Sequence, residues 1–270
     1  MKFFIISDIH TDVWRPKQEY WSTHFSFLKD VDVMVIAGDN GSFCNSLIAL
    51  TQVLLAHPHL EVVYAMGNHD YYGTQLMYAL DTMSWASHQI DRLHVLTSYD
   101  PAWEYKGVVF IGGTLWTDYN KEDVHAMNAV QRALNDYRAI LKSNGKPVTP
   151  NNILQEHYIT KKQIFKMLDK NVGKPCVVVT HHQPFIQGAV TDLVQYGYCV
   201  DLEDKLNECL NPPKYWVHGH THRSTWTHRK YKNGGVTFVS NQFGYPSESS
   251  QITGYRNDCI LEISTEKSPE

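Results

Sequence analysis

Five short apolar runs in this chain each end abruptly in residues of the kind that bind metal ions. Their polar ends are, in order, Asp8-Ile9-His10, Gly38-Asp39, Gly67-Asn68-His69-Asp70, His181-His182 and Gly219-His220-Thr221-His222. Helical spacing of apolar residues between the first three runs predicts an alternating α/β sheet. The carboxyl ends of the strands in such a sheet lie together, so we expect these distant residues to converge.

The rest of the chain continues this pattern. We expect strands at residues 2–7, 31–37, 61–66, 108–111, 176–179, 215–217, 225–231, 236–240 and 259–263. Apolar spacing predicts helices near residues 47–55 and 76–83, and a long helical stretch over 124–141. Thr149-Pro150 is an N-cap and first-turn pair for a further helix, and Asn233-Gly234-Gly235 signals a hairpin.

These elements predict a single domain over residues 1–270, with a helical segment at about 118–172. An aromatic loop or short helix is expected over residues 14–28, between the first two strands. Residues 265–270 are expected to be disordered.

Composition narrows the class of protein. The chain has 270 residues and a net charge of −4, which argues against nucleic acid as a partner. Its five cysteines are scattered and odd in number, so we expect no disulfide framework and a reducing cytoplasm. The first apolar run stops at Asp8, too short for a signal peptide, and no stretch reaches the ~18 apolar residues of a membrane helix. We therefore expect a cytoplasmic protein without a membrane partner.

The strand-end residues have the chemistry of a transition-metal site. Histidine nitrogen, aspartate oxygen and asparagine amide oxygen together suit Mn, Fe, Zn or Co. In Asp8-x-His10 and His220-x-His222, two side chains would leave an extended segment on the same side. Asp39 could bridge two cations, and a preceding glycine lets the chain approach an ion closely. Any one of these motifs could be an ordinary polar turn, but five such turns at five strand ends are a poor explanation for the whole set.

The order DxH, GD, GNHD, strand-TH and GHxH resembles the calcineurin-like metallophosphoesterase superfamily, from Asp8 to His222. Residues 114–119 and 135–138 also resemble a bacterial cytoplasmic subgroup. The resemblance implies an α/β fold, a four-layer α/β/β/α sandwich of two mixed sheets flanked by helices. It also implies two divalent metal ions as cofactors, among which Mn is favoured.

The resemblance assigns a role to each strand-end residue. The first metal would be held by Asp8, His10 and His222, and the second by Asn68, His181 and His220. Asp39 would bridge both ions, and Asn68 would also stabilise phosphoryl charge. His69 would be the catalytic histidine, with Asp70 orienting it.

Two positions depart from a clean match. Many members carry a second acidic residue after GD, where this chain has Asn40, but that residue is not a usual metal ligand. The pair His181-His182 leaves the register open, and we favour His181 because it stands directly at the strand end, three residues before Pro184.

The expected reaction is hydrolysis of a phosphate ester by a hydroxide that bridges the two metals. Cyclic nucleotides, other nucleotide diesters, phosphomonoesters, phosphoproteins and nucleic acid remain open as substrates. A small diester, nucleotide-like in character, is favoured. Residues that could line the mouth of the site, or simply pack in the structure, are Trp116, Tyr119, Tyr137, Arg138 and Arg223. The other histidines are expected at the surface, namely His57, His59, His88, His94, His125, His157 and His228.

Other protein families and functions are alternative interpretations of the same motifs. The run from His218 to His222 faintly echoes the HxHxDH motif of metallo-β-lactamase-like enzymes, but no Asp-His follows it. Amidohydrolase barrels place HxH on the first strand, where this chain has Asp8-x-His10. A phosphomonoesterase or protein phosphatase is an alternative within the resemblance, as is a non-catalytic scaffold with this fold. Nothing in the sequence indicates an oligomeric state.

Overall fold

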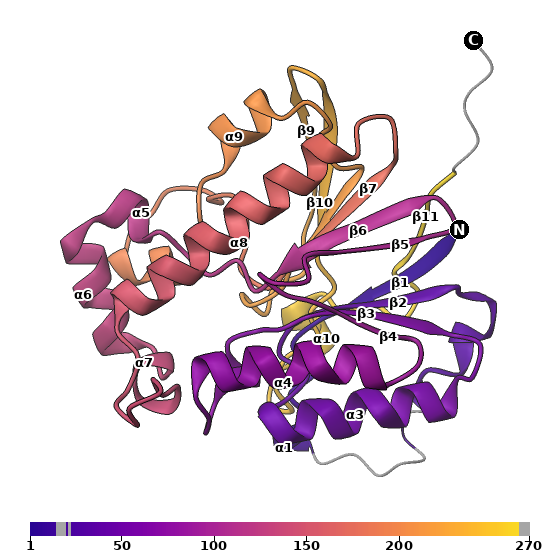
Figure 1. Cartoon of the computed structure of the whole chain (residues 1–270), viewed down its shortest axis with the longest axis horizontal. Coiled ribbons are helices and arrows are strands. Elements are labelled where there is room, and N and C mark those ends of the chain that lie inside the picture. The colour runs from indigo at the N-terminus through magenta and orange to yellow at the C-terminus, as the bar shows by residue number, and fades with distance from the viewer. Residues whose placement is uncertain (15–19, 21–22, 265–270) are drawn as a thin grey trace.

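The computed structural model describes residues 1–14, 20 and 23–264, and its strands form two sheets (Figure 1). The five-stranded sheet has the order β11-β1-β2-β3-β4, and the six-stranded sheet has the order β5-β6-β7-β8-β10-β9. The strands of the first sheet are β1 (Lys2–Ile6), β2 (Val33–Ala37), β3 (Glu61–Ala65), β4 (Leu93–Leu96) and β11 (Ile260–Glu262). Those of the second are β5 (Ala102–Tyr105), β6 (Val108–Gly113), β7 (Cys176–Thr180), β8 (Tyr215–Val217), β9 (Trp226–Tyr231) and β10 (Gly234–Val239).

Both sheets are mixed, with parallel strands at the centre and antiparallel strands at edges. In the first sheet β1, β2, β3 and β4 pair in parallel, and β11 pairs antiparallel with β1. In the second sheet β6, β7, β8 and β10 are parallel, and β5 and β9 are antiparallel edge strands. The carboxyl ends of the parallel strands point toward the side of the molecule where α5, α6 and α7 lie (Figure 1).

Helices cover the outer faces of the two sheets (Figure 1). The longer ones are α3 (Phe43–Ala56), α4 (Leu76–Gln89), α6 (Val124–Ala133) and α8 (Pro150–Lys170). The short ones are α1 (Thr11–Trp14), α5 (Tyr119–Glu122), α7 (Asp136–Ala139), α9 (Glu203–Glu208) and α10 (Ser250–Thr253). Three 3₁₀ turns are described, η1 (Ser26–Asp30), η2 (His69–Tyr71) and η3 (Leu193–Gly197).

Successive side chains of β1 point to opposite faces of the sheet, so they belong to two different layers of the core. Phe3 and Ile5 pack between the sheets, with Val177 and Val239 of the second sheet. Phe4 and Ile6 point the other way, into the cluster that α3 and α4 complete. A third cluster lies between the second sheet and α8. Because every central strand is covered on both faces, it can be apolar throughout. The predicted four-layer α/β/β/α sandwich is confirmed.

Several local predictions are confirmed. A capping box at Thr149, in which its side chain and that of Asn152 satisfy each other's backbone amides, begins α8. The hairpin between β9 and β10 closes with Tyr231 opposite Gly234. Strands β4 and β5 were not predicted, because each is only four residues long. Residues 265–270, which were predicted to be disordered, lie outside the described residues. The same is true of residues 15–19 and 21–22, which belong to the aromatic loop or short helix predicted over 14–28.

The helical stretch predicted over 124–141 is wrong in one respect, because it is broken. Helix α6 ends at Ala133, the backbone of the next residue, Leu134, is extended (φ −82°, ψ 144°), and α7 starts at Asp136. The side chain of Asp136 accepts hydrogen bonds from Asn68 and Tyr72, far away in sequence. These tertiary contacts are incompatible with a straight helix, so they override the local spacing of apolar residues.

The turn called α5 is left-handed. Tyr119, Asn120, Lys121 and Glu122 all have positive φ, between 53° and 68°. Left-handed helical backbone costs roughly 1–2 kcal/mol per residue for side chains with a Cβ, so it persists only where the surroundings fix it. Here the buried Tyr119 hydroxyl lies 2.5 Å from that of Tyr137, and Tyr158 donates to the Glu122 carboxylate.

Among the described residues, none of the helices combines the length and the apolar character needed to cross a membrane. The extent of the domain, residues 1–270 with its helical segment at about 118–172, stays a prediction.

Candidate metal centre

The carboxyl ends of five strands bring the predicted ligand residues together. Asp8 and His10 follow β1, Asp39 follows β2, and Asn68 follows β3. His181 follows β7, and His220 and His222 follow β8. Their side chains are buried, apart from that of His222, which is 14% exposed. Strands of both sheets therefore contribute to one cluster.

One half of the cluster is built from Asp8, His10 and His222. The Nε2 atoms of the two histidines lie 3.0 Å apart, and His222 Nε2 lies 3.5 Å from Asp8 Oδ1. Asp39 Oδ2 is 3.9 Å from His10 Nε2. Two imidazole nitrogens and two carboxylates thus face a common point, as the ligands of a cation do.

The other half is built around His181. Its Nε2 lies 3.0 Å from Asn68 Oδ1, 3.1 Å from His220 Nδ1 and 3.4 Å from Asp39 Oδ2. Asp39 therefore stands between the two halves and offers its carboxylate to both. Two nitrogen-and-oxygen ligand sets that share one carboxylate fit a pair of divalent ions.

Charge in the cluster also fits cations. Burial lowers the pKa of His181, but the Asp39 carboxylate outweighs it and raises that pKa to about 9. Burial likewise lowers the pKa of His222, and Asp8 and Glu248 raise it to about 9. Burial raises the pKa of Asp39, but His181 and His69 bring it well below its usual range. Without ions, protons on these histidines neutralise the buried carboxylates, and metal binding would release them.

The backbone at the ligand positions corrects one expectation. Asp8, His10, Asp39, His220 and His222 have φ values of 56°, 51°, 54°, 75° and 50°. The segments Asp8-x-His10 and His220-x-His222 are therefore not extended. Left-handed residues turn each chain sharply as it leaves its strand, and these turns aim the side chains at the centre. Such strain is common at functional sites.

Glycines allow this close approach, as the sequence predicted. A Cβ on Gly67 would lie 2.1 Å from Asp39 Oδ1 and 2.4 Å from Asp39 N. A Cβ on Gly38, whose φ is +88°, would lie 2.4 Å from His181 Nδ1. A larger residue at either position would have to displace a ligand side chain.

We expect Gly67→Ala to lower the free energy of unfolding by about 1–3 kcal/mol and to reduce metal content, because the new methyl group displaces Asp39. Gly145→Ala is the control, because it places a Cβ at a strained φ of +76° with no atom within 4 Å. Denaturant unfolding and metal analysis of both variants check this. Equal metal content in the two variants would contradict it.

Outer hydrogen bonds fix the orientation of the ligand side chains. His181 Nδ1 donates to the Ala37 carbonyl (2.8 Å), which leaves Nε2 facing the centre. His222 Nδ1 donates to Glu248 Oε2 (2.6 Å). Asn68 Nδ2 donates to Asp136 Oδ1 (2.8 Å), so its Oδ1 points at the cluster. The roles of Glu248 and Asp136 were not predicted, although Asp136 lies within the segment 135–138 that resembles the bacterial subgroup.

We expect Glu248→Gln to weaken metal binding about 10- to 100-fold, because the neutral amide no longer polarises the ring of His222. Chelator competition measures this affinity. Glu208→Gln serves as the control, because it removes an exposed carboxylate whose ion pair, among the residues that the structure describes, is with Lys205. An unchanged affinity in Glu248→Gln would show that the hydrogen bond to His222 does not matter for the ion.

Asp70, which was expected to orient His69, makes its hydrogen bonds to other residues. One of its oxygens accepts from the backbone amides of Gly67 (2.6 Å) and Asp39 (3.1 Å), and the other accepts from Ser46 Oγ. Burial, with the nearby Asp39 charge, raises the pKa of Asp70 to about 7. Asp70 thus ties together the two loops that carry ligands, and its hydrogen bonds do not orient the ring of His69.

His69 lies at the mouth of the cluster, with 19% of its side chain exposed. Its ring stacks on Tyr72 at 4.2 Å, and its Nε2 lies 3.3 Å from the Tyr245 hydroxyl and 4.0 Å from Asp39 Oδ2. The mouth is a cavity of about 360 Å³, in which Asn135, Tyr198 and Glu248 form further parts of the wall.

The residues expected to line this mouth lie elsewhere. Trp116 and Tyr119 are 2% and 0% exposed and belong to the core, and Tyr137 is buried there too. The guanidinium of Arg138 donates to the carbonyls of Leu134 and Arg132. Arg223 lines a neighbouring cavity. The aromatic residues that do line the mouth, Tyr72, Tyr198 and Tyr245, carry no spacing signal in the sequence.

The structure separates the two adjacent histidines. His181 faces the cluster, whereas His182 Nδ1 lies 3.3 Å from the Thr114 carbonyl and its ring packs near Trp116. The expectation that the remaining histidines are at the surface is wrong for His57 and His157, which are buried.

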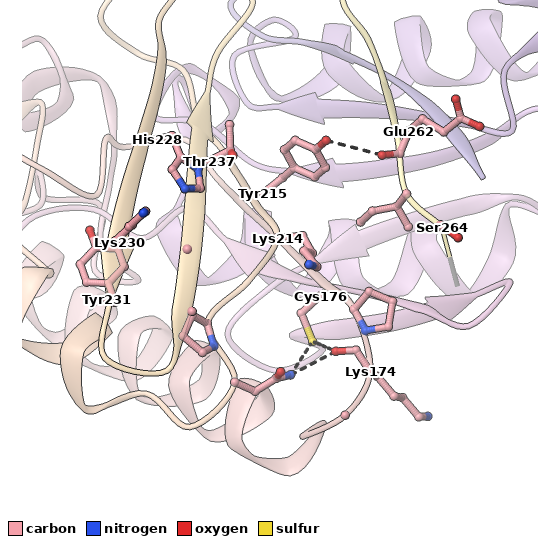
Figure 2. A pocket seen from close by; sticks show the side chains of 17 residues that line it. Lys174, Cys176, Lys214, Tyr215, His228, Lys230, Tyr231, Thr237, Glu262 and Ser264 are labelled. Carbon is pink, nitrogen blue, oxygen red and sulfur yellow. Dashed lines mark hydrogen bonds between the residues drawn. The ribbon is translucent and has the colours of Figure 1, made fainter. Parts of the chain in front are cut away.

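A separate cavity of about 970 Å³ lies at the opposite ends of the strands, where β7, β8 and β10 begin (Figure 2). Lys214, His228 and Lys230 line it, as does Lys174, which pairs with Glu104. Among the described residues, the groups of histidines and carboxylates able to hold a metal all lie in the cluster at the carboxyl ends. The candidate site is therefore that cluster.

The chain matches a known protein family over most of its length. A family model described as calcineurin-like phosphoesterase matches residues 1–224. No curated protein matches the chain. Among solved structures, a purple acid phosphatase isolated from yellow lupin (Lupinus luteus) seeds is similar, at 12% identity and a TM-score of 0.49. The match covers 89% of this chain and 43% of that chain, so this chain spans less than half the length of that structure.

Proposed function

Because the chain belongs to the calcineurin-like phosphoesterase family, a family of metal-dependent phosphoesterases, we propose that it is a phosphodiesterase for a small, nucleotide-like substrate. The observation that carries the proposal is the pair of ligand groups that share Asp39. Asp8, His10 and His222 would hold one ion, and Asn68, His181 and His220 the other. Such a mixed nitrogen and oxygen set suits Mn, Fe, Zn or Co, and among these we propose Mn.

When bound, two such ions supply a nucleophile at neutral pH by lowering the pKa of a shared water, and they neutralise phosphoryl charge. The chain's own residues do the rest. Asp39 and the left-handed ligand turns hold the two ligand sets at a fixed separation. His69 Nε2, at the mouth, would donate a proton to the departing oxygen, and the stacked ring of Tyr72 keeps it in place.

The charge of the mouth supports a diester over a monoester. Its lining includes the carboxylates of Asp136 and Glu248 and, among the described residues, no lysine or arginine. A phosphate monoester carries about one more negative charge than a diester at neutral pH, and the described part of the mouth offers no lysine or arginine to compensate that charge. The monoanionic diester is the better electrostatic fit.

The test is hydrolysis of bis-p-nitrophenyl phosphate and of p-nitrophenyl phosphate by metal-stripped protein, with and without added Mn(II). We expect metal-dependent turnover that favours the diester. Preference for the monoester would assign the chain to phosphatases instead. No turnover of either ester, with two ions verified as bound, would count against catalysis.

We also propose that the protein works in the cytoplasm. All five cysteines are free thiols in the structure, as a reducing compartment requires.

A further inference from the structure

A second, larger cavity adjoins the mouth of the metal centre. It has a volume of about 1010 Å³, against about 360 Å³ for the mouth. Tyr198 and Thr221 line both cavities. Thr221 stands between the candidate ligands His220 and His222, and the ring centre of Tyr198 lies 4.8 Å from that of His220. The two cavities therefore meet at the metal centre itself.

The volumes of the two cavities indicate which part of the substrate each cavity can hold. The mouth is near the lower limit of ligand pockets, which hold about 300–1,000 Å³. It has room for the reacting phosphate but little for the groups esterified to it. The adjoining cavity, which begins at Tyr198 and Thr221, is a large space into which one of those groups can extend.

The lining of the adjoining cavity combines polar side chains with apolar ones, such as Ile186, Val190 and Ile252, and is almost uncharged. Amide and hydroxyl side chains of Gln183, Gln187, Gln195, Gln251, Ser224 and Thr225 line it. Among the described lining residues there is no carboxylate, and Arg223 supplies the single formal charge. Amides and hydroxyls both donate and accept hydrogen bonds, so this lining suits the hydroxyls of a sugar or the edge of a base.

Arg223 has a fixed backbone and a free head group. Its carbonyl accepts hydrogen bonds from Gln242 Nε2 (2.8 Å) and Ser240 Oγ (3.4 Å). Its guanidinium makes no ion pair or hydrogen bond within the described part of the chain. By contrast, the guanidinium groups of Arg229 and Arg256 pair with Glu203 and Asp258. A free guanidinium at a cavity wall is suited to an anionic oxygen group such as phosphate.

We propose, on the basis of the phosphodiesterase function above, that this cavity binds one ester arm of the substrate, and that this arm is a nucleoside bearing a second phosphate. The ring of the nucleoside stacks on Tyr198, which lines both cavities. Its polar edges bond the surrounding amides and hydroxyls. The second phosphate is held by Arg223, which makes Arg223 a residue that determines substrate specificity.

Two chromogenic diesters that differ only in that phosphate test the proposal. They are thymidine 5′-(p-nitrophenyl phosphate) and its 3′-phosphorylated form. We expect the Mn(II)-loaded protein to hydrolyse the 3′-phosphorylated ester with a kcat/KM about 10-fold higher or more, the usual effect of a charge-assisted hydrogen bond. In Arg223→Gln this ratio should fall toward 1. Arg256→Gln makes the same change at an exposed arginine outside both cavities, and should keep the wild-type ratio.

The outcomes separate this inference from the proposed function. Hydrolysis of both thymidine esters with equal kcat/KM, or a ratio that Arg223→Gln leaves unchanged, would overturn the inference while the phosphodiesterase function stands. Failure to hydrolyse these esters and bis-p-nitrophenyl phosphate, with two ions bound per chain, would overturn the function and the inference with it.

Discussion

Asp39→Asn is expected to lose turnover by at least about 10³-fold and to lose metal, because Asp39 supplies the carboxylate that both ligand groups share. The asparagine oxygen can still accept the backbone amide of His69, as Asp39 Oδ1 does at 2.9 Å. Its amide nitrogen would then face His181 and His10, and an NH₂ group cannot bind a cation. Metal analysis and the hydrolysis of bis-p-nitrophenyl phosphate measure the two effects.

Asp91→Asn provides the matched control. It makes the same change at a carboxylate that is 95% exposed and far from the ligand loops in sequence. We expect this control to keep both metals and full activity. An Asp39→Asn protein that held two ions and worked at the wild-type rate would refute the bridging role.

His69→Ala is expected to keep its metal but to lower kcat about 10²- to 10⁴-fold for diesters with alkyl leaving groups, the usual contribution of a general acid. The ring of His69 lies 4.0 Å from Asp39 Oδ2, at the open side of the cluster, and the other ligands surround the centre without it. The loss should be smaller for p-nitrophenyl esters, because nitrophenolate departs without a proton. Comparing the two leaving groups thus distinguishes proton donation from a structural role.

His88→Ala is the control, since this histidine is 65% exposed and pairs with Asp100 at the surface. Loss of one ion from His69→Ala would instead make His69 a ligand, an arrangement that its nearness to His10 and Asp39 permits. Unaltered activity on alkyl diesters would remove His69 from the mechanism.

The convergence of the candidate site was predictable because topology dictates it. Parallel strands that are consecutive in an α/β sheet must end on the same side, so Asp8, Asp39 and Asn68 had to meet. The apolar stretches were equally informative, since only strands covered on both faces can be as uniformly apolar as β2 and β7. The short edge strands β4 and β5 carry too few residues for such a signal.

What the sequence could not predict depends on tertiary contacts. Glu248 reaches His222 from a loop, and Asp136 reaches Asn68 only because the helix breaks at Leu134. Neither residue has a spacing that relates it to its partner. For the same reason, the sequence could not decide whether an aromatic residue such as Trp116 lines the mouth or packs in the structure, and Trp116 packs in the core.

The left-handed turn of α5 reverses the usual rules for engineering a helix. Alanine, the strongest helix former, would gain nothing at Asn120 or Lys121, because both residues sit at φ 59° with exposed side chains. Glycine, which breaks ordinary helices, reaches this mirror-image conformation without penalty and is the residue that favours it. A redesign guided by helix propensity would therefore weaken the segment leading into α6 and the broken helix that walls the mouth, while appearing to strengthen it.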